Sequence, residues 1–327
     1  MKFEGSIFLV GGTGTLGQEF LKAAQLNDWD CDITVYSRGW QKQYELKRYF
    51  PEVRFIVGDI LNFDLLKASI AGHDLVIHMA AMKHVVEGEY NPLAVIETNV
   101  MGSQNVLQAC ADLRVPDVIG ISTDKACKPV NAYGTSKMMM ERLFQQYAEM
   151  FVDTRFHLVR YGNVFGSSGS FIHNWMNDIA EFGLVRSTNP EMTRFWLTAQ
   201  DAMELIYNSL SEPTGCTLIP RAKAAKVGDI EQWLIPEGIE IDYIGVRPGE
   251  KMHECLLSDE EGYRAEQVFF DEYQVSPFYR LYPAYFPRSK AGFTPRFSSS
   301  TSIQLSKEEF LELSGLAGDE LHADNHS

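Results

Sequence analysis

The stretch SIFLVGGTGTLGQEFLKAA, residues 6–24, decides the fold of this chain. Its first five residues are an apolar run bounded by glycine, which is typical of a buried parallel strand. The segment GGTGTLG follows and opens an amphipathic helix, with glycines at Gly11, Gly14 and Gly17. Glycine permits a tight turn and lets the backbone approach a pyrophosphate, whose charge then lies at the helix amino terminus. The stretch therefore predicts a dinucleotide site at the first turn of an α/β domain.

Strand-like and helix-like segments continue to alternate, with short connections, as far as residue 165. The later strands are expected at residues 32–37, 53–60, 74–81 and 117–123. A loop and a long helix with Asn91 and Pro92 near its start separate the last two of these strands. This alternation predicts a doubly wound parallel sheet of the Rossmann type.

The length of 327 residues predicts two lobes, because single cores stop growing at roughly 250–300 residues. We expect an NADP-binding domain over residues 1–165 and a smaller substrate-binding lobe over 166–295, with segments of the lobe returning to the first domain. Residues 296–327 are expected to form a carboxyl-terminal helix followed by an acidic, frayed tail.

Composition narrows the class of protein. The net charge of -15 argues against a nucleic-acid partner, which would need a basic face. The apolar runs are too short to span a bilayer and the amino terminus enters a strand at once, so we expect a cytoplasmic protein without membrane partners. The five cysteines are scattered without metal spacing and predict buried thiols and no metal, although Cys127 lies near the proposed site.

The end of the second strand favours NADP. An NAD enzyme of this fold usually offers a carboxylate there to hold the ribose 2′-hydroxyl, whereas this chain has Tyr36, Ser37 and Arg38. Arg38 can pair with a 2′-phosphate and Ser37 can donate to it; the alternative is an arginine that is only solvated. Further along, Asp59 either holds the adenine edge or caps a turn. Ala80 and Ala81 have small side chains. They would let the backbone lie against the cofactor or, as the alternative, let a helix pack closely.

Catalytic groups gather in ISTDKACKPVNAYGTSKMMMERLF, residues 121–144. Tyr133 and Lys137 stand four apart on a predicted helix and share a face, so the ammonium can lower the pKa of the phenol. The phenolate can then take a proton from a sugar hydroxyl while hydride leaves the same carbon. Thr123 can hydrogen-bond that hydroxyl from the end of the preceding strand. These residues predict a hydride-transfer site.

Asp124 and Lys125 are an adjacent carboxyl and amine, which an elimination of water requires and a plain dehydrogenase does not. One can protonate a leaving hydroxyl while the other removes a carbon-bound proton. This use needs Lys125 neutral part of the time, which we expect burial and the positive charges of Lys137 and a nicotinamide to promote. Each motif alone also occurs in ordinary helices and turns, so the interpretation depends on their combination.

The second half of the chain supplies positive charge for a diphosphate. Arg194 in MTRFWLT and Arg247 in RPGEK can grip phosphate oxygens with their guanidinium forks, or can be surface ion-pair partners. The run RFHLVRYGNVFG is a strand that leads into Asn163 and a loop, GSSGS, of unusual backbone freedom.

The motifs GGTGTLG, YSR, GDI, STDKACKPVNAYGTSK, VRYGNVFGSSGS, MTRFWLT and IGVRPGEKMHE, in this order, resemble the inverting UDP-N-acetylglucosamine 4,6-dehydratases, extended short-chain dehydrogenases of polysaccharide biosynthesis. The resemblance implies NADP, a UDP-sugar substrate, a C5-inverted 4-keto product and a homo-oligomer, either dimer or hexamer. It implies the catalytic residues Thr123, Asp124 (acid), Lys125 (base), Tyr133 and Lys137. The cofactor contacts are expected at Gly11, Thr13, Gly14, Thr15, Leu16, Gly17, Ser37, Arg38, Asp59, Ile60, Ala80, Ala81, Lys83, Asn99, Tyr133 and Lys137. The substrate contacts are expected at Lys83, Asn163, Arg194, Arg247 and Glu250.

Two residues depart from the family pattern, which usually reads GSRGS followed by a proline: Ser168 stands for the arginine and His173 for the proline. The lost arginine leaves the exact sugar open. Three other functions also stay open. A C4 epimerase or 4-keto reductase would use Tyr133 and Lys137 alone, a cofactor-sensing regulator would need only the glycine loop, and a scaffold subunit would bind no cofactor.

Overall fold

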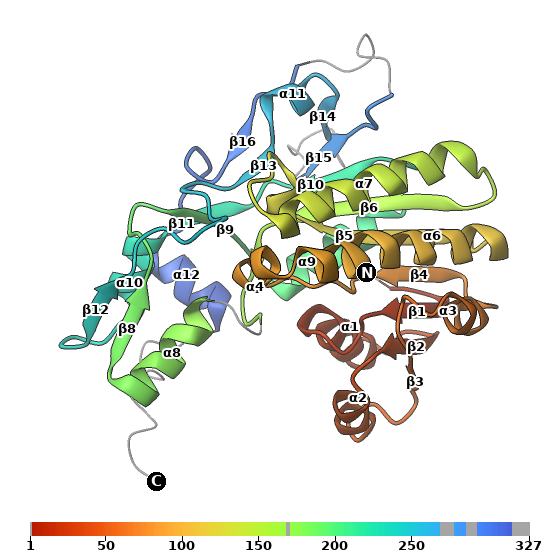
Figure 1. The fold of residues 1–327 in the computed structure, drawn as a ribbon, viewed down its shortest axis with the longest axis horizontal. Helices are drawn as coiled ribbons and strands as arrows, with labels where there is room; N and C mark the ends of the chain where they lie inside the picture. Colours follow the sequence, from red (N-terminus) through yellow and green to blue (C-terminus); the bar gives the residue numbers. More distant parts are fainter. Residues whose placement is uncertain (1, 168–170, 269–277, 286–292, 316–327) are drawn as a thin grey trace.

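The computed structural model describes residues 2–167, 171–268, 278–285 and 293–315. Its main body is a nine-stranded sheet with helices on both faces, and a smaller lobe lies to one side (Figure 1). In spatial order the strands are β14 (Ala265–Val268), β15 (Phe278–Leu281), β10 (Thr217–Pro220), β6 (Arg155–Tyr161), β5 (Asp117–Thr123), β4 (Leu75–His78), β1 (Gly5–Val10), β2 (Cys31–Ser37) and β3 (Arg54–Val57).

The strands from β10 to β3 run parallel, and β15 and β14 continue the sheet antiparallel. The chain order reverses at β1, with β2 and β3 on one side and β4, β5 and β6 on the other. Ligands of such sheets bind beyond the carboxyl ends of the strands at this switch point. β3 and β4 end at Val57 and His78, earlier than predicted, and the chain beyond each strand enters this region.

The apolar run of β1 is buried on both faces. Ile7 and Leu9 pack toward α1 (Thr15–Leu26) and α9 (Ala199–Ser209). Phe8 and Val10 pack on the other face, toward α3 (Phe63–Ile70), α6 (Gly102–Leu113) and α7 (Ala132–Met150). Because helices cover both faces, the strand is apolar at every position from Ile7 to Val10 and shows no alternation there.

The segment between β4 and β5 begins with α4 (Val85–Tyr90). A second helical run follows, made of α5 (Pro92–Val95), the π-helical turn η1 (Ile96–Met101) and α6. Pro92 occupies the first turn of α5, where its missing N–H costs nothing, so the predicted helix start is confirmed. The π-helical turn was not predicted.

The smaller lobe holds two short sheets and three helices among its described residues. The sheets pair β7 (Asn163–Val164) and β11 (Lys223–Lys226) with β9 (Thr193–Leu197), and β8 (Leu184–Ser187) with β12 (Glu240–Tyr243). The helices are α8 (Phe171–Phe182), α10 (Val227–Leu234) and α12 (Lys307–Ser314). Phe165, Trp175, Trp196, Ile230 and Phe310 form the apolar centre of the lobe.

A third short sheet pairs β13 (Cys255–Leu257) with β16 (Phe297–Ser298) and lies beside the large sheet, as does α11 (Asp259–Gly262) (Figure 1). Leu256, Leu257 and Phe297 pack in the main core, and α11 contacts β14.

The second half of the chain also builds the main body, because β10, β14 and β15 lie in the large sheet and α9 covers it. The segment expected to be a terminal helix forms β16 beside the large sheet and α12 in the smaller lobe, while the acidic tail, residues 316–327, lies outside the described residues. Over the described ranges, we find no helix with the length and apolarity that a membrane span requires.

Candidate active site

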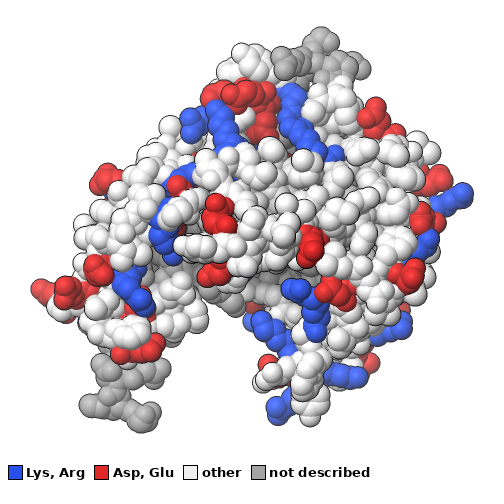
Figure 2. Space-filling model, viewed as in Figure 1, with Lys and Arg blue, Asp and Glu red and all other residues white. Residues whose placement is uncertain are grey.

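A cleft of about 1080 Å³ runs along the carboxyl ends of the parallel strands and reaches the smaller lobe. Figure 2 shows the molecule hollowed between its two parts, with Lys and Arg side chains at the rim. Most of the predicted site residues line the cleft: Gly11, Thr13, Gly14, Thr15, Leu16, Gly17, Ser37, Arg38, Ile60, Ala80, Ala81, Lys83, Thr123, Lys125, Tyr133, Lys137, Asn163, Arg194, Arg247 and Glu250. Three predicted residues, Asp59, Asn99 and Asp124, are not among those that line it.

The glycine loop lies against the end of β4. Gly11 has a φ of 82°, and a β-carbon on it would come 2.7 Å from the Cα of Ala80. A β-carbon on Gly17 would come 2.2 Å from the carbonyl oxygen of Gly12. Gly14 is the N-cap of α1, so the helix amino terminus faces the cleft. This backbone suits the pyrophosphate of a dinucleotide, because free N–H groups and the helix dipole both favour an anion.

The end of the cleft beyond β2 carries cations. Arg38 has a side chain that is 68% exposed and lies 3.9 Å from Asp59. Asp59 itself accepts a hydrogen bond from the Leu61 N–H at 2.9 Å. It therefore caps a turn, which was the alternative to holding the adenine edge. Lys42 on α2 (Trp40–Lys47) also lines the cleft and was not predicted, although it lies four residues after Arg38 in the sequence.

Asn99 acts behind the cleft wall. Its side chain accepts from the Met82 N–H at 2.7 Å and donates to the Met82 carbonyl at 3.0 Å. It also donates to the Ser136 hydroxyl of α7 at 2.9 Å. Asn99 therefore holds the cleft-lining segment at Met82 against the helix that carries the predicted catalytic pair.

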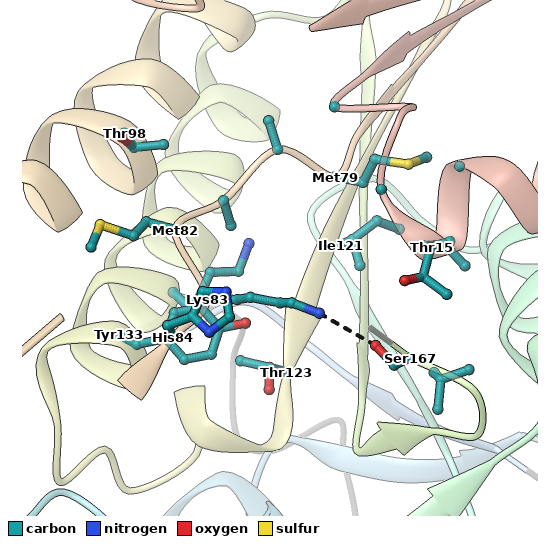
Figure 3. Close-up of a pocket in the computed structure, with 18 of the residues that line it drawn as sticks. Thr15, Met79, Met82, Lys83, His84, Thr98, Ile121, Thr123, Tyr133 and Ser167 are labelled. Atoms are coloured by element: carbon teal, nitrogen blue, oxygen red, sulfur yellow. Dashed lines mark hydrogen bonds between the residues drawn. The ribbon is translucent and has the colours of Figure 1, made fainter. Parts of the chain in front are cut away.

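The predicted catalytic side chains converge from two adjacent elements. Thr123 ends β5, and Asp124 and Lys125 form the following 3-10 turn, η2 (Asp124–Ala126). Tyr133 and Lys137 lie in the first turns of α7, which Asn131 caps by accepting from the Gly134 N–H at 2.6 Å. Figure 3 shows Thr123, Tyr133 and Lys83 close together at the cleft.

Two hydrogen bonds join the groups of the η2 turn. The Thr123 hydroxyl donates to Asp124 Oδ1 at 2.9 Å, and Lys125 Nζ donates to the same oxygen at 3.0 Å. Asp124 is fully buried, and its Oδ2 has no hydrogen-bond partner within the described part of the chain. A buried carboxylate with one free oxygen can accept or hold a proton there.

The cation that acts on the phenol differs from our expectation. Burial and the charge of Asp124 hold the pKa of Tyr133 above its ordinary value, although the charge of Lys125 and a hydrogen bond with Thr123 act to lower it. Lys137 is not among the charges that act on this pKa in the free protein, and activation of the phenol by its ammonium stays a prediction. Burial instead lowers the pKa of Lys137 itself to about 7, and its Nζ donates to Met140 Sδ at 3.0 Å.

The expected neutral state of Lys125 is wrong for the free protein. Burial lowers its pKa, but the charges of Asp124 and Glu254 outweigh burial and the pKa lies above its ordinary value. Glu254 Oε1 lies 3.8 Å from Lys125 Nζ, and its side chain is 3% exposed. Sequence reasoning missed Glu254, which lies in the quoted motif IGVRPGEKMHE and whose distance to Lys125 no local pattern predicts.

The residues predicted to bind substrate come to the cleft from separate segments. Arg194 is buried and donates to the carbonyls of Thr193 and Met252 at 2.9 and 3.3 Å. Arg247 pairs with Glu250 at 2.6 Å. These contacts hold both guanidinium groups at the cleft despite the negative net charge.

Lys83 reaches across the cleft and donates to the Ser167 hydroxyl at 3.3 Å (Figure 3). Ser168 lies outside the described residues, and His173 is exposed on α8. Cys127 is buried, and its thiol donates to Glu261 at 3.4 Å, as the interpretation of a buried thiol expects.

Comparison with known proteins gives the family. The family model of polysaccharide biosynthesis proteins matches residues 7–275. The chain belongs to this family. A UDP-N-acetylglucosamine 4,6-dehydratase (inverting) of Campylobacter jejuni is 37% identical over 278 residues, 83% of each chain. A UDP-glucose 4-epimerase of Rickettsia conorii is 33% identical over 324 residues, 94% of each chain.

Solved structures share the fold of this chain. Pen from Bacillus thuringiensis superimposes with a TM-score of 0.86 at 32% identity, over 98% of this chain and 99% of that one. DesIV, a dTDP-glucose 4,6-dehydratase from Streptomyces venezuelae, has a TM-score of 0.66 at 22% identity over 75% of this chain and 86% of that one, which shows the fold alone. The predicted doubly wound α/β fold with a smaller lobe is confirmed.

Proposed function

We propose that this protein removes water from UDP-N-acetylglucosamine and forms a C5-inverted UDP-2-acetamido-2,6-dideoxy-4-keto-hexose. The observation that carries the proposal is the Asp124–Lys125 pair, joined at 3.0 Å beside Tyr133. A sugar oxidoreductase needs the tyrosine, but only an elimination needs a carboxyl and an amine next to it. The Campylobacter jejuni relative bears the name of this activity.

The residues of the cleft fit a nicotinamide dinucleotide. The glycine loop would hold its pyrophosphate, and Ser37, Arg38 and Lys42 would hold a ribose 2′-phosphate, which favours NADP over NAD. When bound, such a cofactor would supply the acceptor for the hydride of sugar C4 and its donor to C6. No carboxylate lines the cleft at the end of β2, where NAD enzymes of this fold usually offer one, among the residues that the structure describes.

Tyr133 takes the proton of the C4 hydroxyl. The nearby charge of Lys125 and the hydrogen bond with Thr123 both favour the phenolate against burial. Thr123 can also bond the sugar hydroxyl, because it lies at the cleft. Oxidation at C4 leaves a ketone that makes the C5 hydrogen acidic.

One proton transfer prepares the elimination. If the proton of Lys125 moves along its 3.0 Å hydrogen bond to Asp124, the pair becomes a neutral amine and a carboxylic acid. The amine of Lys125 then removes the C5 proton, and the acid of Asp124 donates to O6 as water leaves. This restores the ammonium and the carboxylate, so protons balance over the step. A proton returned to C5 from the opposite face gives the inverted sugar.

Positive and polar groups at the other end of the cleft would bind the UDP diphosphate. Arg194, Arg247, Lys83 and Asn163 line that part, and Glu250 orients Arg247 through their ion pair. We also propose a homo-oligomer, dimer or hexamer. The exposed apolar side chains of Tyr90, Leu93 and Ile96, on consecutive helical segments, support this assembly.

The test is turnover of UDP-N-acetylglucosamine with NADP in deuterated water. We expect the product mass to show the loss of one water, with one solvent deuterium at C5 and the former C4 hydrogen at C6. A C4 epimer or a reduced sugar formed without loss of water would overturn the proposal. That result would favour the epimerase named for the Rickettsia conorii relative.

A further inference from the structure

Lys125 lies between two buried carboxylates, and the proposed reaction uses only one of them. Its Nζ is 3.0 Å from Asp124 Oδ1 and 3.8 Å from Glu254 Oε1. Asp124 is fully buried and Glu254 is 3% exposed in their side chains. Burying a carboxylate is costly unless its charge has a function or a partner, so the second one needs an explanation.

The structure holds Glu254 firmly beside the catalytic turn. Its N–H donates to the Ser299 hydroxyl at 2.9 Å, and the Ser299 N–H donates back to its carbonyl at 3.0 Å. The strand that follows it, β13, packs against the η2 turn. The backbone of Glu254 is therefore fixed from two sides beside the η2 turn.

The charges around Lys125 come from four parts of the fold. Asp124 precedes it on the η2 turn, Glu254 precedes β13, Arg194 extends from β9, and the Tyr133 phenol faces it from α7. The other oxygen of Glu254 lies 3.5 Å from the ammonium of Lys251, which in turn donates to the Cys127 carbonyl at 2.7 Å. Glu254 is thus shared between two ammonium groups and hydrogen-bonds tightly to neither.

The chemistry separates the roles of the two carboxylates. When Lys125 takes the C5 proton, Asp124 carries the proton destined for O6 and is neutral. The ammonium that forms then faces one remaining buried carboxylate on the described part of the chain, which is Glu254. In a site of low dielectric, an anion at this distance favours the charged base strongly.

We propose that Glu254 is the counter-ion that stabilises Lys125 as it takes the C5 proton. It is a positioning residue that acts through Lys125 and leaves C4 oxidation to Tyr133. This inference rests on the proposed dehydration.

The test compares Glu254→Gln with the wild type and with Glu231→Gln. We expect Glu254→Gln to lower kcat for water loss, and deuterium exchange at C5, at least tenfold. KM should stay within about twofold, and the NADPH absorbance that reports C4 oxidation should still form. Since Glu254 raises the pKa of Lys125, the alkaline limb of the pH profile of kcat should move to lower pH. A merely structural defect would not move this limb.

Controls separate the possible failures. Glu231 is also buried in the smaller lobe and bonded by Ser187 and Tyr243, so Glu231→Gln loses a matched charge away from the cleft and should keep the wild-type profile. Adding Glu254→Gln to Lys125→Ala should cost nothing more, because the counter-ion acts only through the lysine. Should Glu254→Gln fail to fold, Glu254→Asp keeps the charge and should keep the alkaline limb.

A Glu254→Gln enzyme with wild-type kcat and an unmoved pH profile would overturn the inference. A Glu254→Asp enzyme would overturn it too if its alkaline limb moved to lower pH as far as loss of the charge should move it, because this variant keeps the charge. A wild-type enzyme that removes no water would instead defeat the proposed function.

Discussion

Lys125 and Tyr133 both line the cleft, and the charge of the lysine opposes the burial that raises the pKa of the phenol. We expect Lys125→Ala to reduce water loss at least about a hundredfold, since general acid or base groups contribute roughly that much or more. Some C4 oxidation should persist and appear as NADPH absorbance on adding substrate, whereas Tyr133→Phe should suppress both steps. Dehydration at the wild-type rate by Lys125→Ala would remove the lysine from the mechanism.

Arg38 is the residue on which the cofactor preference depends. Arg38→Ala should weaken the binding of NADP roughly tenfold or more and leave the binding of NAD almost unchanged. The reason is that a hydrogen bond to a charged group is worth about 1.5–3 kcal/mol. The measurement is titration of both cofactors by fluorescence. Arg54→Ala is the matched control, since Arg54 is an exposed arginine on the neighbouring strand β3 that does not line the cleft. Denatured wild-type protein that releases only NAD would contradict the prediction.

At the scale of elements, Arg160 ties β6 to α7 and α11. Its guanidinium donates to Glu141 of α7 at 2.6 and 2.9 Å, to Glu261 of α11 at 2.8 and 2.9 Å, and to the Leu256 carbonyl. Glu141 also accepts from the Ser122 hydroxyl of β5 at 2.6 Å. The network therefore fixes the helix that carries Tyr133 and Lys137.

Removing this arginine should be costly. Arg160→Met should lower the free energy of unfolding by about 3–5 kcal/mol, because it leaves two buried carboxylates without their cation. Urea denaturation measures the loss. Arg155→Met, on the same strand, breaks an ion pair whose arginine side chain is 56% exposed, and should change stability by less than about 1 kcal/mol. Equal losses in the two variants would contradict the role of the network.

The same network predicts a dependence of stability on pH. Burial raises the pKa of Glu261, but the charge and hydrogen bonds of Arg160 outweigh it and lower the pKa from 4.5 to about 2. A depressed folded pKa stabilises the protein above the unfolded value, and this contribution is lost as pH falls from about 4.5 toward 2. Glu261→Gln should therefore flatten the decline in the free energy of unfolding over that range. An unchanged slope would show that other groups cause the decline.

At the scale of the whole molecule, the last described segment completes the smaller lobe. Phe310 of α12 is fully buried and contacts the rings of Phe165 and Trp196. Phe310→Ala should cost about 3–5 kcal/mol in the free energy of unfolding, by loss of buried surface and a residual cavity. Leu313→Ala on the same helix, at a side chain 41% exposed, should cost much less. Urea denaturation of both variants checks the difference, and similar losses would place α12 outside the core.

Local patterns determined much of this protein. The glycine loop, the start of the helix at Pro92 and the four-residue spacing of Tyr133 and Lys137 are set within one or two elements. Turn chemistry, capping and helical periodicity act over a few residues, so the sequence alone predicts them. The order of these elements also predicts the parallel sheet and places the candidate site at its switch point.

Only the tertiary structure decided the protonation of the site. Burial acts to lower the pKa of Lys125, but the charges of Asp124 and Glu254 outweigh it and raise that pKa, and Glu254 reaches the lysine from the far half of the chain. The same holds for Arg160, whose partners lie on two helices far apart in sequence. A pKa depends on every charge within a few ångströms, and folding brings those charges together from segments that no local pattern relates.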